Sequence, residues 1–204
     1  PRAGLLFTVP VLSSLLLTLT ALARTATALM VILFVGLALA ATYPFMKRFH
    51  HLPQAHLGAA FGWGIPMAYA AVTDSLPAIA WLLFLGNVLW AVIYDTQYAM
   101  VDREDDRKIG VKSTALWFGE RAKRIIAYLQ ATLLGLLAVI GLLAGRGWIY
   151  YLAVFAAAWF ALYQQYLIRD RAPEECFKAF LNNNGFGLAI FCGLLLDFLP
   201  AGLP

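Results

Sequence analysis

The chain has 204 residues, of which 62% are hydrophobic and only 13% are charged. That charged share is about half of what soluble globular domains carry, so the composition argues against a soluble enzyme, a disordered tail and a disulfide-stapled secreted domain. The 15 basic and 11 acidic residues leave a net charge of +4, and the composition favours an integral membrane protein.

The charged residues divide the chain into seven uncharged intervals of 18 to 25 residues. Each is close to the ~20 residues that a helix needs to cross a membrane. Helices satisfy their own backbone hydrogen bonds in lipid, and the runs lack the two-residue alternation of barrel strands. We therefore expect an all-α, polytopic transmembrane helical bundle. Its seven predicted helices cover approximately residues 4–22, 26–45, 56–73, 77–99, 124–144, 148–168 and 181–199. Gly62, Gly64 and Pro66 are candidates either to kink the third of them or to let other helices approach closely.

The basic residues mark the sides of the membrane. The connections at 46–55, 100–123 and 169–180, together with Arg2 and the adjoining Arg124, hold 13 of the 15 basic residues, and Arg24 and Arg146 fall on the other side. In bacterial membrane proteins the basic loops stay in the cytoplasm. The bias predicts a multi-pass protein of the bacterial cell inner membrane with its long loops on the cytoplasmic side. The positive charge is thus a topology signal and gives no reason to expect a nucleic-acid partner.

Five of the acidic residues lie between positions 95 and 106, at the predicted cytoplasmic end of the fourth helix. If that helix continues to about residue 107, Asp102 and Asp106 are i, i+4 neighbours on one face, and Asp95 roughly shares this face. Tyr94 and Tyr98 form a second i, i+4 pair on the same helix. Gly110 is the expected helix stop.

Two readings of this acidic stretch are open. Carboxylates at i, i+4 repel each other, and Mg²⁺ is the natural cation to relieve this, held by one or two carboxylates while phosphate oxygens fill other positions. Arg107, Lys108 and Lys112 follow directly, so the pattern suggests a diphosphate site at the membrane surface. The other reading is a solvated, salt-bridged helix end. Asp95 favours the functional reading, because an ionisable group near the membrane boundary is costly.

Several motifs carry a resemblance to a known family. They include the stretch Tyr94 to Asp106 with Gly110 to Thr114, then Tyr43 to Arg48, His51 to Gln54, Leu57 to Trp63, and Cys176 to Asn184. Together they resemble the UbiA family of membrane prenyltransferases, and the branch acting on 4-hydroxybenzoate in particular. The resemblance covers essentially the whole chain, and its motifs are long and specific.

The resemblance implies a fold of nine transmembrane helices with two aspartate-rich loops on the cytoplasmic side. In the family, two Mg²⁺ ions bridge these loops and the diphosphate of a polyprenyl diphosphate donor. The polyprenyl group is transferred to the ring of 4-hydroxybenzoate, ortho to the hydroxyl, in ubiquinone biosynthesis. The lipid bilayer surrounds the enzyme.

The resemblance also implies roles for particular residues. Asp102 and Asp106 match the metal ligands of the family's second aspartate-rich motif, and Asp95 is a candidate for a further metal or substrate contact or else a structural acid. Glu104 and Asp105 are expected to point away from the metal and into solvent.

The substrate contacts are implied in the same way. Lys108 and Lys112 are candidate diphosphate contacts or else membrane-surface bases. Arg48 matches the residue proposed to hold the carboxylate of 4-hydroxybenzoate, a role that suits the planar fork of arginine, and Lys47 is expected to share it. Tyr94 and Tyr98 are candidates to line the pocket or to pack between helices.

The chain departs from the family pattern at its beginning. The first aspartate-rich motif, of the type Asn-Asp-x-x-Asp, is absent, and nothing before Asp74 is acidic. Seven helices plus two missing ones would give nine. We therefore expect residues 1–204 to form a single transmembrane prenyltransferase domain that is N-terminally truncated, and we expect these residues alone to be inactive.

Other functions remain open at this stage. A transporter or channel fragment would use Asp95 as an ion site, but the inverted repeats typical of transporters are not seen. A phosphotransferase acting on CDP-alcohols would need an Asp-Gly-x2-Ala-Arg signature, which is missing. Within the family, homogentisate, dihydroxynaphthoate, haem and chlorophyllide are alternative acceptors.

Overall fold

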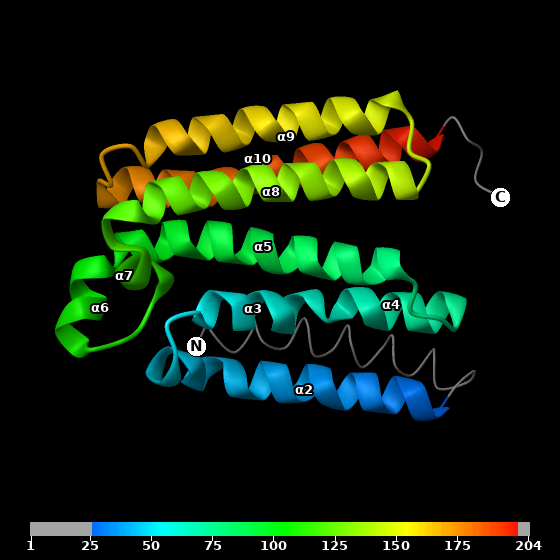
Figure 1. Ribbon diagram of the computed structural model, residues 1–204, viewed down its shortest axis with the longest axis horizontal. Coiled ribbons are helices and arrows are strands. Elements are labelled where there is room, and N and C mark those ends of the chain that lie inside the picture. Colours follow the sequence, from blue (N-terminus) through cyan, green and yellow to red (C-terminus); the bar gives the residue numbers. More distant parts are fainter. Residues whose placement is uncertain (1–25, 200–204) are drawn as a thin grey trace.

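The computed structural model of the protein describes residues 26–199, and every regular element in this part of the chain is a helix (Figure 1). In chain order they are α2 (Ala26–Phe49), α3 (Pro53–Gly62), α4 (Gly64–Thr73), α5 (Ala78–Val101), α6 (Arg103–Ile109), α7 (Thr114–Phe118), the 3-10 turn η1 (Gly119–Arg121), α8 (Ala122–Leu143), α9 (Trp148–Leu167) and α10 (Pro173–Phe198). The all-α expectation is confirmed here. The predicted helix over 4–22 lies outside the described residues.

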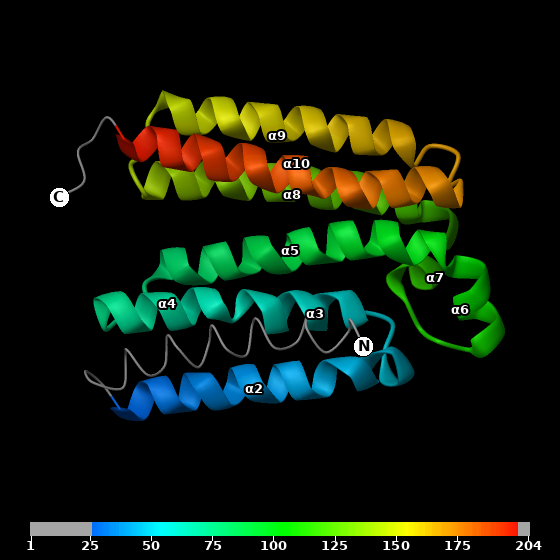
Figure 2. The same cartoon turned by 180° about the vertical axis from the view of Figure 1, so that it is seen from behind.

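The long helices run along a common direction and pack in a fixed order. Contacts join α2 to α3, α3 to α5, α5 to both α8 and α10, and α9 to both α8 and α10. Figures 1 and 2 show α2 at one edge and α8, α9 and α10 grouped at the other. The short helices α6 and α7 lie at the same end of the bundle as the α2–α3 and α9–α10 connections (Figure 1). We call this the α6 end. The three basic connections all lie at the α6 end, in agreement with the expectation that they share one side of the bundle.

Four of the described segments are long and apolar enough to cross a membrane by length and composition. They are Ile32–Phe49, Ala78–Val101, Thr114–Leu143 and Pro173–Phe198. The third combines α7, η1 and α8. The predicted span over 56–73 is present as two shorter helices, α3 and α4, and the span over 148–168 is present as α9, which is rich in tyrosine, tryptophan and glutamine.

The break between α3 and α4 falls at Trp63, within the Gly62–Pro66 stretch for which a kink was one of two expectations. Pro66 has no backbone N–H to donate into the preceding turn, and Gly62 and Gly64 flank the break. The indole Nε1 of Trp63 donates to the carbonyl oxygen of Ile32 on α2 at 2.6 Å. This hydrogen bond therefore holds α2 against the α3–α4 pair at the break.

Helix α3 packs closely on α5 at Gly58. A Cβ atom at this position would lie 2.8 Å from the Cα of Val88, so only glycine fits without a backbone shift. The Nδ2 of Asn87 donates to the carbonyl oxygen of Gly58 at 3.0 Å. Small residues that let helix backbones approach, supported by such hydrogen bonds, are the usual means of packing helices in membranes.

The last helix begins eight residues earlier than the sequence predicted, at Pro173 rather than at 181. Proline is favoured in the first helical turn because its missing N–H has no partner there. Glu174 and Glu175 in the same turn suit the positive end of the helix dipole. The charge spacing located only the apolar part of α10. As a result Asn182, Asn183 and Asn184 lie inside the helix and not at its start.

A network of buried side-chain amides joins four helices. Its central residue is Gln164 on α9, whose Oε1 accepts from the Nε2 of Gln97 on α5 at 3.0 Å and from the Nε2 of Gln130 on α8 at 2.8 Å. The Nε2 of Gln164 donates to Oδ1 of Asn182 on α10 at 3.2 Å. Gln97 and Gln164 are 0% and 1% exposed. The network therefore fixes the relative positions of α5, α8, α9 and α10.

Replacing Gln164 with leucine is expected to lower the free energy of unfolding by about 2 kcal/mol. The change removes three hydrogen bonds, each worth roughly 0.6 kcal/mol between membrane helices, and leaves their partners unpaired. Unfolding of the purified protein in detergent with increasing denaturant measures the effect. The control is Gln165→Leu, because Gln165 makes a single bond to Gln130. Equal losses in the two variants, or no loss in Gln164→Leu, would contradict the role given to Gln164.

Candidate active site at the α6 end

Three acidic residues lie along the chain where α5 gives way to α6. Asp95 lies in the last turns of α5, Asp102 occupies the junction, and Asp106 is on α6. The helix is interrupted at Asp102, whereas the sequence analysis assumed a continuous helix to about residue 107. The N–H of Asp106 still donates to the carbonyl oxygen of Asp102 at 2.8 Å, so the i, i+4 relation survives the break. Gly110 ends α6 with a φ of 72°, as predicted.

The acidic residues separate onto two faces of α6. Glu104 pairs with Arg107 at 3.4 Å and Asp105 with Lys108 at 3.0 Å, and all four side chains are exposed. Asp106, in contrast, is only 8% exposed. Within residues 26–199 no salt bridge reaches Asp95, Asp102 or Asp106. The outer face of α6 is thus a solvated, salt-bridged surface. The carboxylates of the inner face form no ion pair with any residue of 26–199.

Asp95 faces the end of α2 and the start of α3. Lys47 and Asp106 lie close enough to act on its charge, and Tyr43 is within the same range. The backbone of the loop after α6 is tied to this place, because the N–H of Lys112 donates to the carbonyl oxygen of Lys47 at 3.0 Å. The Nζ of Lys112 donates to the carbonyl oxygen of Phe49 at 3.0 Å. Helix α2 and the loop after α6 therefore meet around the inner acidic face.

Gln54 is a polar residue at this site to which the sequence pattern assigned no role beyond its place in the motif His51 to Gln54. Its side chain is fully buried, and its Oε1 accepts from the N–H of Thr114 at 3.3 Å. Its Nε2 approaches the carboxylate of Asp95 without reaching hydrogen-bond geometry and has no other partner among the described residues. An unpaired buried donor costs about 1–3 kcal/mol. A ligand atom that accepts a hydrogen bond from this Nε2 would remove that cost.

Local structure around Gln54 is held by hydroxyl groups. Ser113 caps α7, with its Oγ accepting from the N–H of Leu116 at 3.4 Å. Thr114 and Thr96 share a hydrogen bond of 2.6 Å between their hydroxyl oxygens. The signal that would have found Gln54 is its place directly after Pro53, the first residue of α3, next to the basic end of α2.

The predicted basic contacts fall into two groups. Lys47 is half-buried beside the inner acidic face, and Lys112 reaches the same place through the loop. Arg48 is exposed at the end of α2. Lys108 lies on the outer face of α6, paired with Asp105, and the structure does not bring it together with Asp106.

The two predicted pocket tyrosines pack against α10. The ring centroids of Tyr94 and Phe180 are 6.2 Å apart, and those of Tyr98 and Phe180 are 5.1 Å apart. Tyr94 is also close enough to Asp95 and Tyr43 to interact with them electrostatically. Tyr94 therefore borders both the acidic site and the aromatic surface of α10, whereas Tyr98 belongs to the latter.

The inner face suits a magnesium ion that is shared with a substrate. Among the described residues no three histidine, cysteine or acidic side chains gather closely enough to form a metal site by themselves. Mg²⁺, however, is usually bound by one or two carboxylates together with phosphate oxygens and water. The uncompensated carboxylates of Asp102 and Asp106 match such a donor set.

Comparison with known proteins places the chain in a class of intramembrane enzymes. The model of the UbiA prenyltransferase family matches residues 1–191, and the chain belongs to this family. The 4-hydroxybenzoate octaprenyltransferase of Alkalilimnicola ehrlichii is 61% identical over 168 residues, which are 82% of this chain and 57% of that protein. The enzyme of the same name from Klebsiella pneumoniae is 56% identical over 198 residues, 97% of this chain and 67% of that protein.

Solved structures agree with the fold. The apo structure of a UbiA homolog from Aeropyrum pernix K1 superposes with a TM-score of 0.71 at 26% identity, covering 85% of this chain and 65% of that one. A digeranylgeranylglyceryl phosphate synthase gives a TM-score of 0.73 at 16% identity, covering 91% of this chain and 67% of that one; at that identity the likeness concerns the fold alone. The chain thus spans 57% to 67% of the length of these proteins.

Proposed function

We propose that the protein transfers a polyprenyl group from a polyprenyl diphosphate to the ring of 4-hydroxybenzoate, ortho to the hydroxyl, in ubiquinone biosynthesis. The observation that carries this proposal is the inner face of α6 and α5 in a chain of the UbiA family, where Asp95, Asp102 and Asp106 form no ion pair with any other residue of 26–199. The names of the most similar relatives support the choice of acceptor and donor.

The donor diphosphate is proposed to bind at the inner acidic face. Asp102 and Asp106 would hold Mg²⁺, which when bound offsets the charge of the diphosphate and so favours its departure. Lys112 and Lys47 would contact phosphate oxygens from the α2 side. Lys108 can serve only from the outer face, after leaving Asp105. Gln54 and Asp95 lie deeper, where the first carbons of the polyprenyl chain or the acceptor would approach.

The acceptor is proposed to bind at the end of α2. Arg48 can form a bidentate pair with the carboxylate of 4-hydroxybenzoate, and Lys47 is next to it on the chain. Holding that carboxylate orients the ring so that a carbon ortho to the hydroxyl faces the donor. The carbon–oxygen bond of the donor breaks, a carbon–carbon bond forms at that ring position, and the ring proton there leaves last.

The bundle is proposed to sit in the bacterial inner membrane with the α6 end in the cytoplasm. Among the described residues, Arg146 is the one basic side chain at the opposite end, where it lies 3.9 Å from Asp197. The excess of basic residues at the α6 end therefore follows the charge rule for cytoplasmic loops. Both the diphosphate and 4-hydroxybenzoate would then enter from the cytoplasm.

Transfer by membranes that contain the protein at its full natural length tests this function. Octaprenyl diphosphate is offered together with equal amounts of 4-hydroxybenzoate, homogentisate and dihydroxynaphthoate. We expect the polyprenylated product of 4-hydroxybenzoate alone, and nuclear magnetic resonance of the product should place the chain next to the hydroxyl. Preferential formation of either of the other two products would reject the proposed acceptor while leaving the family activity in place.

A further inference from the structure

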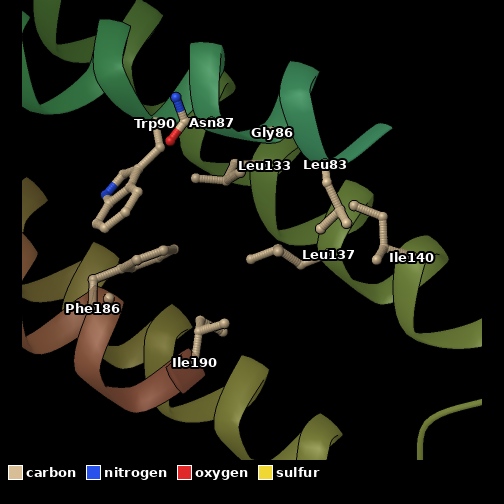
Figure 3. A pocket seen from close by; sticks show the side chains of 10 residues that line it. Leu83, Gly86, Asn87, Trp90, Leu133, Leu137, Ile140, Phe186 and Ile190 are labelled. Carbon is tan, nitrogen blue, oxygen red and sulfur yellow. The ribbon is translucent and has the colours of Figure 1, made fainter. Parts of the chain in front are cut away.

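Gln54 carries a buried hydrogen-bond donor that has no partner. The side chain is fully buried, and among the buried side-chain nitrogen atoms of residues 26–199 only its Nε2 and the Nε of Arg103 make no hydrogen bond. Asn87, in contrast, which Figure 3 shows at the edge of an apolar cavity between α5, α8 and α10, donates its Nδ2 to the carbonyl oxygen of Gly58 at 3.0 Å. An unpaired buried donor is destabilising, so the Nε2 of Gln54 needs a partner that these residues do not supply.

The amide of Gln54 is held in one orientation. Its Oε1 accepts from the backbone N–H of Thr114 at 3.3 Å. A backbone N–H only donates, so a flipped amide would lose this bond. Thr114 is itself fixed, because its hydroxyl bonds to that of Thr96 on α5 at 2.6 Å. The Nε2 therefore lies on the side of Asp95, whose carboxylate it approaches without reaching hydrogen-bond geometry.

The Nε2 of Gln54 and the carboxylate of Asp95 are complementary to a hydroxyl group. An amide N–H only donates hydrogen bonds, a carboxylate only accepts them, and a hydroxyl does both. A hydroxyl between the two side chains would accept from Nε2 and donate its hydrogen to the carboxylate. Within residues 26–199 no salt bridge reaches Asp95, so no ion pair has to be broken for this bond.

The other oxygen atoms of the two proposed substrates are charged and have charged partners elsewhere. In the proposed function the diphosphate binds at Asp102 and Asp106 through Mg²⁺, and the carboxylate of 4-hydroxybenzoate binds Arg48. Asp95 precedes Asp102 by seven residues, about 10 Å along α5, so Gln54 and Asp95 lie deeper in the bundle than the diphosphate. The hydroxyl of 4-hydroxybenzoate lies across the ring from its carboxylate and next to the carbon that is alkylated. It is the one neutral oxygen, and it matches a neutral donor.

We propose that Gln54 is an acceptor-binding residue that determines specificity for the aromatic hydroxyl. Its Nε2 donates to the hydroxyl oxygen of 4-hydroxybenzoate, and the carboxylate of Asp95 accepts the hydroxyl hydrogen. The inference rests on the proposed function, because it takes the acceptor to be 4-hydroxybenzoate with its carboxylate at the end of α2. It adds a contact for the other end of the ring, and it supplies the partner that the buried donor lacks.

The first test needs no substitution and uses membranes that contain the protein at its full natural length. 4-Methylbenzoate competes there with 4-hydroxybenzoate for octaprenyl transfer. It has the same carboxylate and nearly the same shape, but its methyl group leaves Nε2 and the carboxylate of Asp95 unpaired. A site built to bond a hydroxyl strongly rejects an analogue that lacks it, so we expect the inhibition constant of 4-methylbenzoate to exceed KM for 4-hydroxybenzoate about a hundredfold or more. An inhibition constant comparable with that KM would overturn the inference.

Replacing Gln54 with methionine tests the donor itself. Methionine keeps the unbranched shape but has no N–H. We expect KM for 4-hydroxybenzoate to rise about tenfold, the size of one lost hydrogen bond. Because the contact is made equally before and during the reaction, kcat and KM for octaprenyl diphosphate should stay within about twofold. The control is Gln165→Met, which removes an amide that bonds to Gln130 on α8, and both of its KM values should stay within about twofold.

4-Aminobenzoate distinguishes acceptor binding from a merely structural role of Gln54. Its amino group can donate to Asp95, but the nitrogen lone pair is shared with the ring and accepts poorly. Its constant as a competitor of 4-hydroxybenzoate should therefore change by no more than about twofold in Gln54→Met, because no bond to Nε2 is lost. If Gln54 only held Asp95 in place, the variant would weaken both acceptors alike. That result, or a rise in KM for octaprenyl diphosphate in place of KM for the acceptor, would overturn the inference.

The outcomes separate this inference from the proposed function. Any of the contrary results, together with continued transfer to 4-hydroxybenzoate, would overturn the inference and leave the proposed function standing. If size-exclusion chromatography in detergent shows that Gln54→Met does not fold, the 4-methylbenzoate measurement on the unaltered protein decides. An unaltered protein that does not alkylate 4-hydroxybenzoate would overturn the proposed function and this inference with it.

Discussion

Replacing Asp106 with asparagine is expected to reduce polyprenyl transfer by about a hundredfold or more. The substitution keeps the size of a side chain that is 8% exposed, but it removes the negative charge that would hold Mg²⁺ against the diphosphate. Losing one electrostatic contact to a charged reacting group typically costs about a hundred- to a thousandfold in rate. Initial rates in membranes with 4-hydroxybenzoate and octaprenyl diphosphate measure the effect, and Asp102→Asn should behave similarly.

The neighbouring acid provides a matched control for this prediction. Asp105→Asn makes the same change one residue earlier on α6, at a side chain that is 79% exposed and paired with Lys108. We expect its rate to stay within about twofold of the unaltered protein, as for most exposed substitutions. Full activity in Asp106→Asn would reject the metal assignment. Equal losses in the two variants would show that the whole acidic stretch acts through its charge and not through the inner face.

Replacing Arg48 with alanine is expected to raise KM for 4-hydroxybenzoate by about ten- to a hundredfold, with KM for the donor unchanged. Hydrogen bonds to a charged group contribute about 1.5–3 kcal/mol, and a loss of that size corresponds to this range of affinity. Arg48 is exposed at the end of α2, so the fold does not depend on it. Steady-state kinetics with each substrate varied in turn separate the two constants.

The control for Arg48 is another exposed arginine at the α6 end. Arg107→Ala removes a side chain that pairs with Glu104 on the outer face of α6. It takes away the same formal charge from the same end of the bundle, and we expect neither KM to change by more than about twofold. If Arg48→Ala raises KM for the donor instead of the acceptor, the assignment of Arg48 to the carboxylate of 4-hydroxybenzoate is wrong.

The distribution of charge predicted the helices well and their ends less well. Transferring charges into hydrocarbon is so costly that the uncharged intervals coincide with helices α2, α5, α8 and α9 to within a few residues. The spacing of charges does not locate the end of a helix that extends into water, because such an end can carry charged residues. For this reason the first turns of α10, which begin at Pro173 and carry Glu174 and Glu175, were expected to be part of a loop.

The site was predictable where its chemistry depends on local spacing. Asp102 and Asp106 are four residues apart, and a backbone hydrogen bond keeps them in that relation even though the helix breaks between them. The pairing of Lys108 with Asp105 follows the same local rule, because residues at i, i+3 are neighbours on a helix, whereas Asp106 is only two residues from Lys108 and lies on another face. Only the fold brings Lys112 back to α2 across more than sixty residues of sequence.

The buried amides could not be predicted from sequence. Gln97, Gln130 and Gln164 are uncharged and lie more than thirty residues from one another, so no periodicity connects them. Their shared position follows only from the packing of α5, α8 and α9. A role for Gln54 at the site could not be predicted for the same reason, because it depends on the approach of Asp95 from a different helix.

In the proposed reaction the inner acidic face binds a diphosphate through Mg²⁺, and the polyprenyl chain passes to 4-hydroxybenzoate. The most direct measurement is product formation from octaprenyl diphosphate and 4-hydroxybenzoate in membranes containing the protein at its full natural length, before and after chelation of divalent metal. We expect octaprenyl-4-hydroxybenzoate to form, to stop forming on chelation and to resume when Mg²⁺ is restored. Product formation that continues undiminished without divalent metal, or no product with Mg²⁺ present, would contradict the claim.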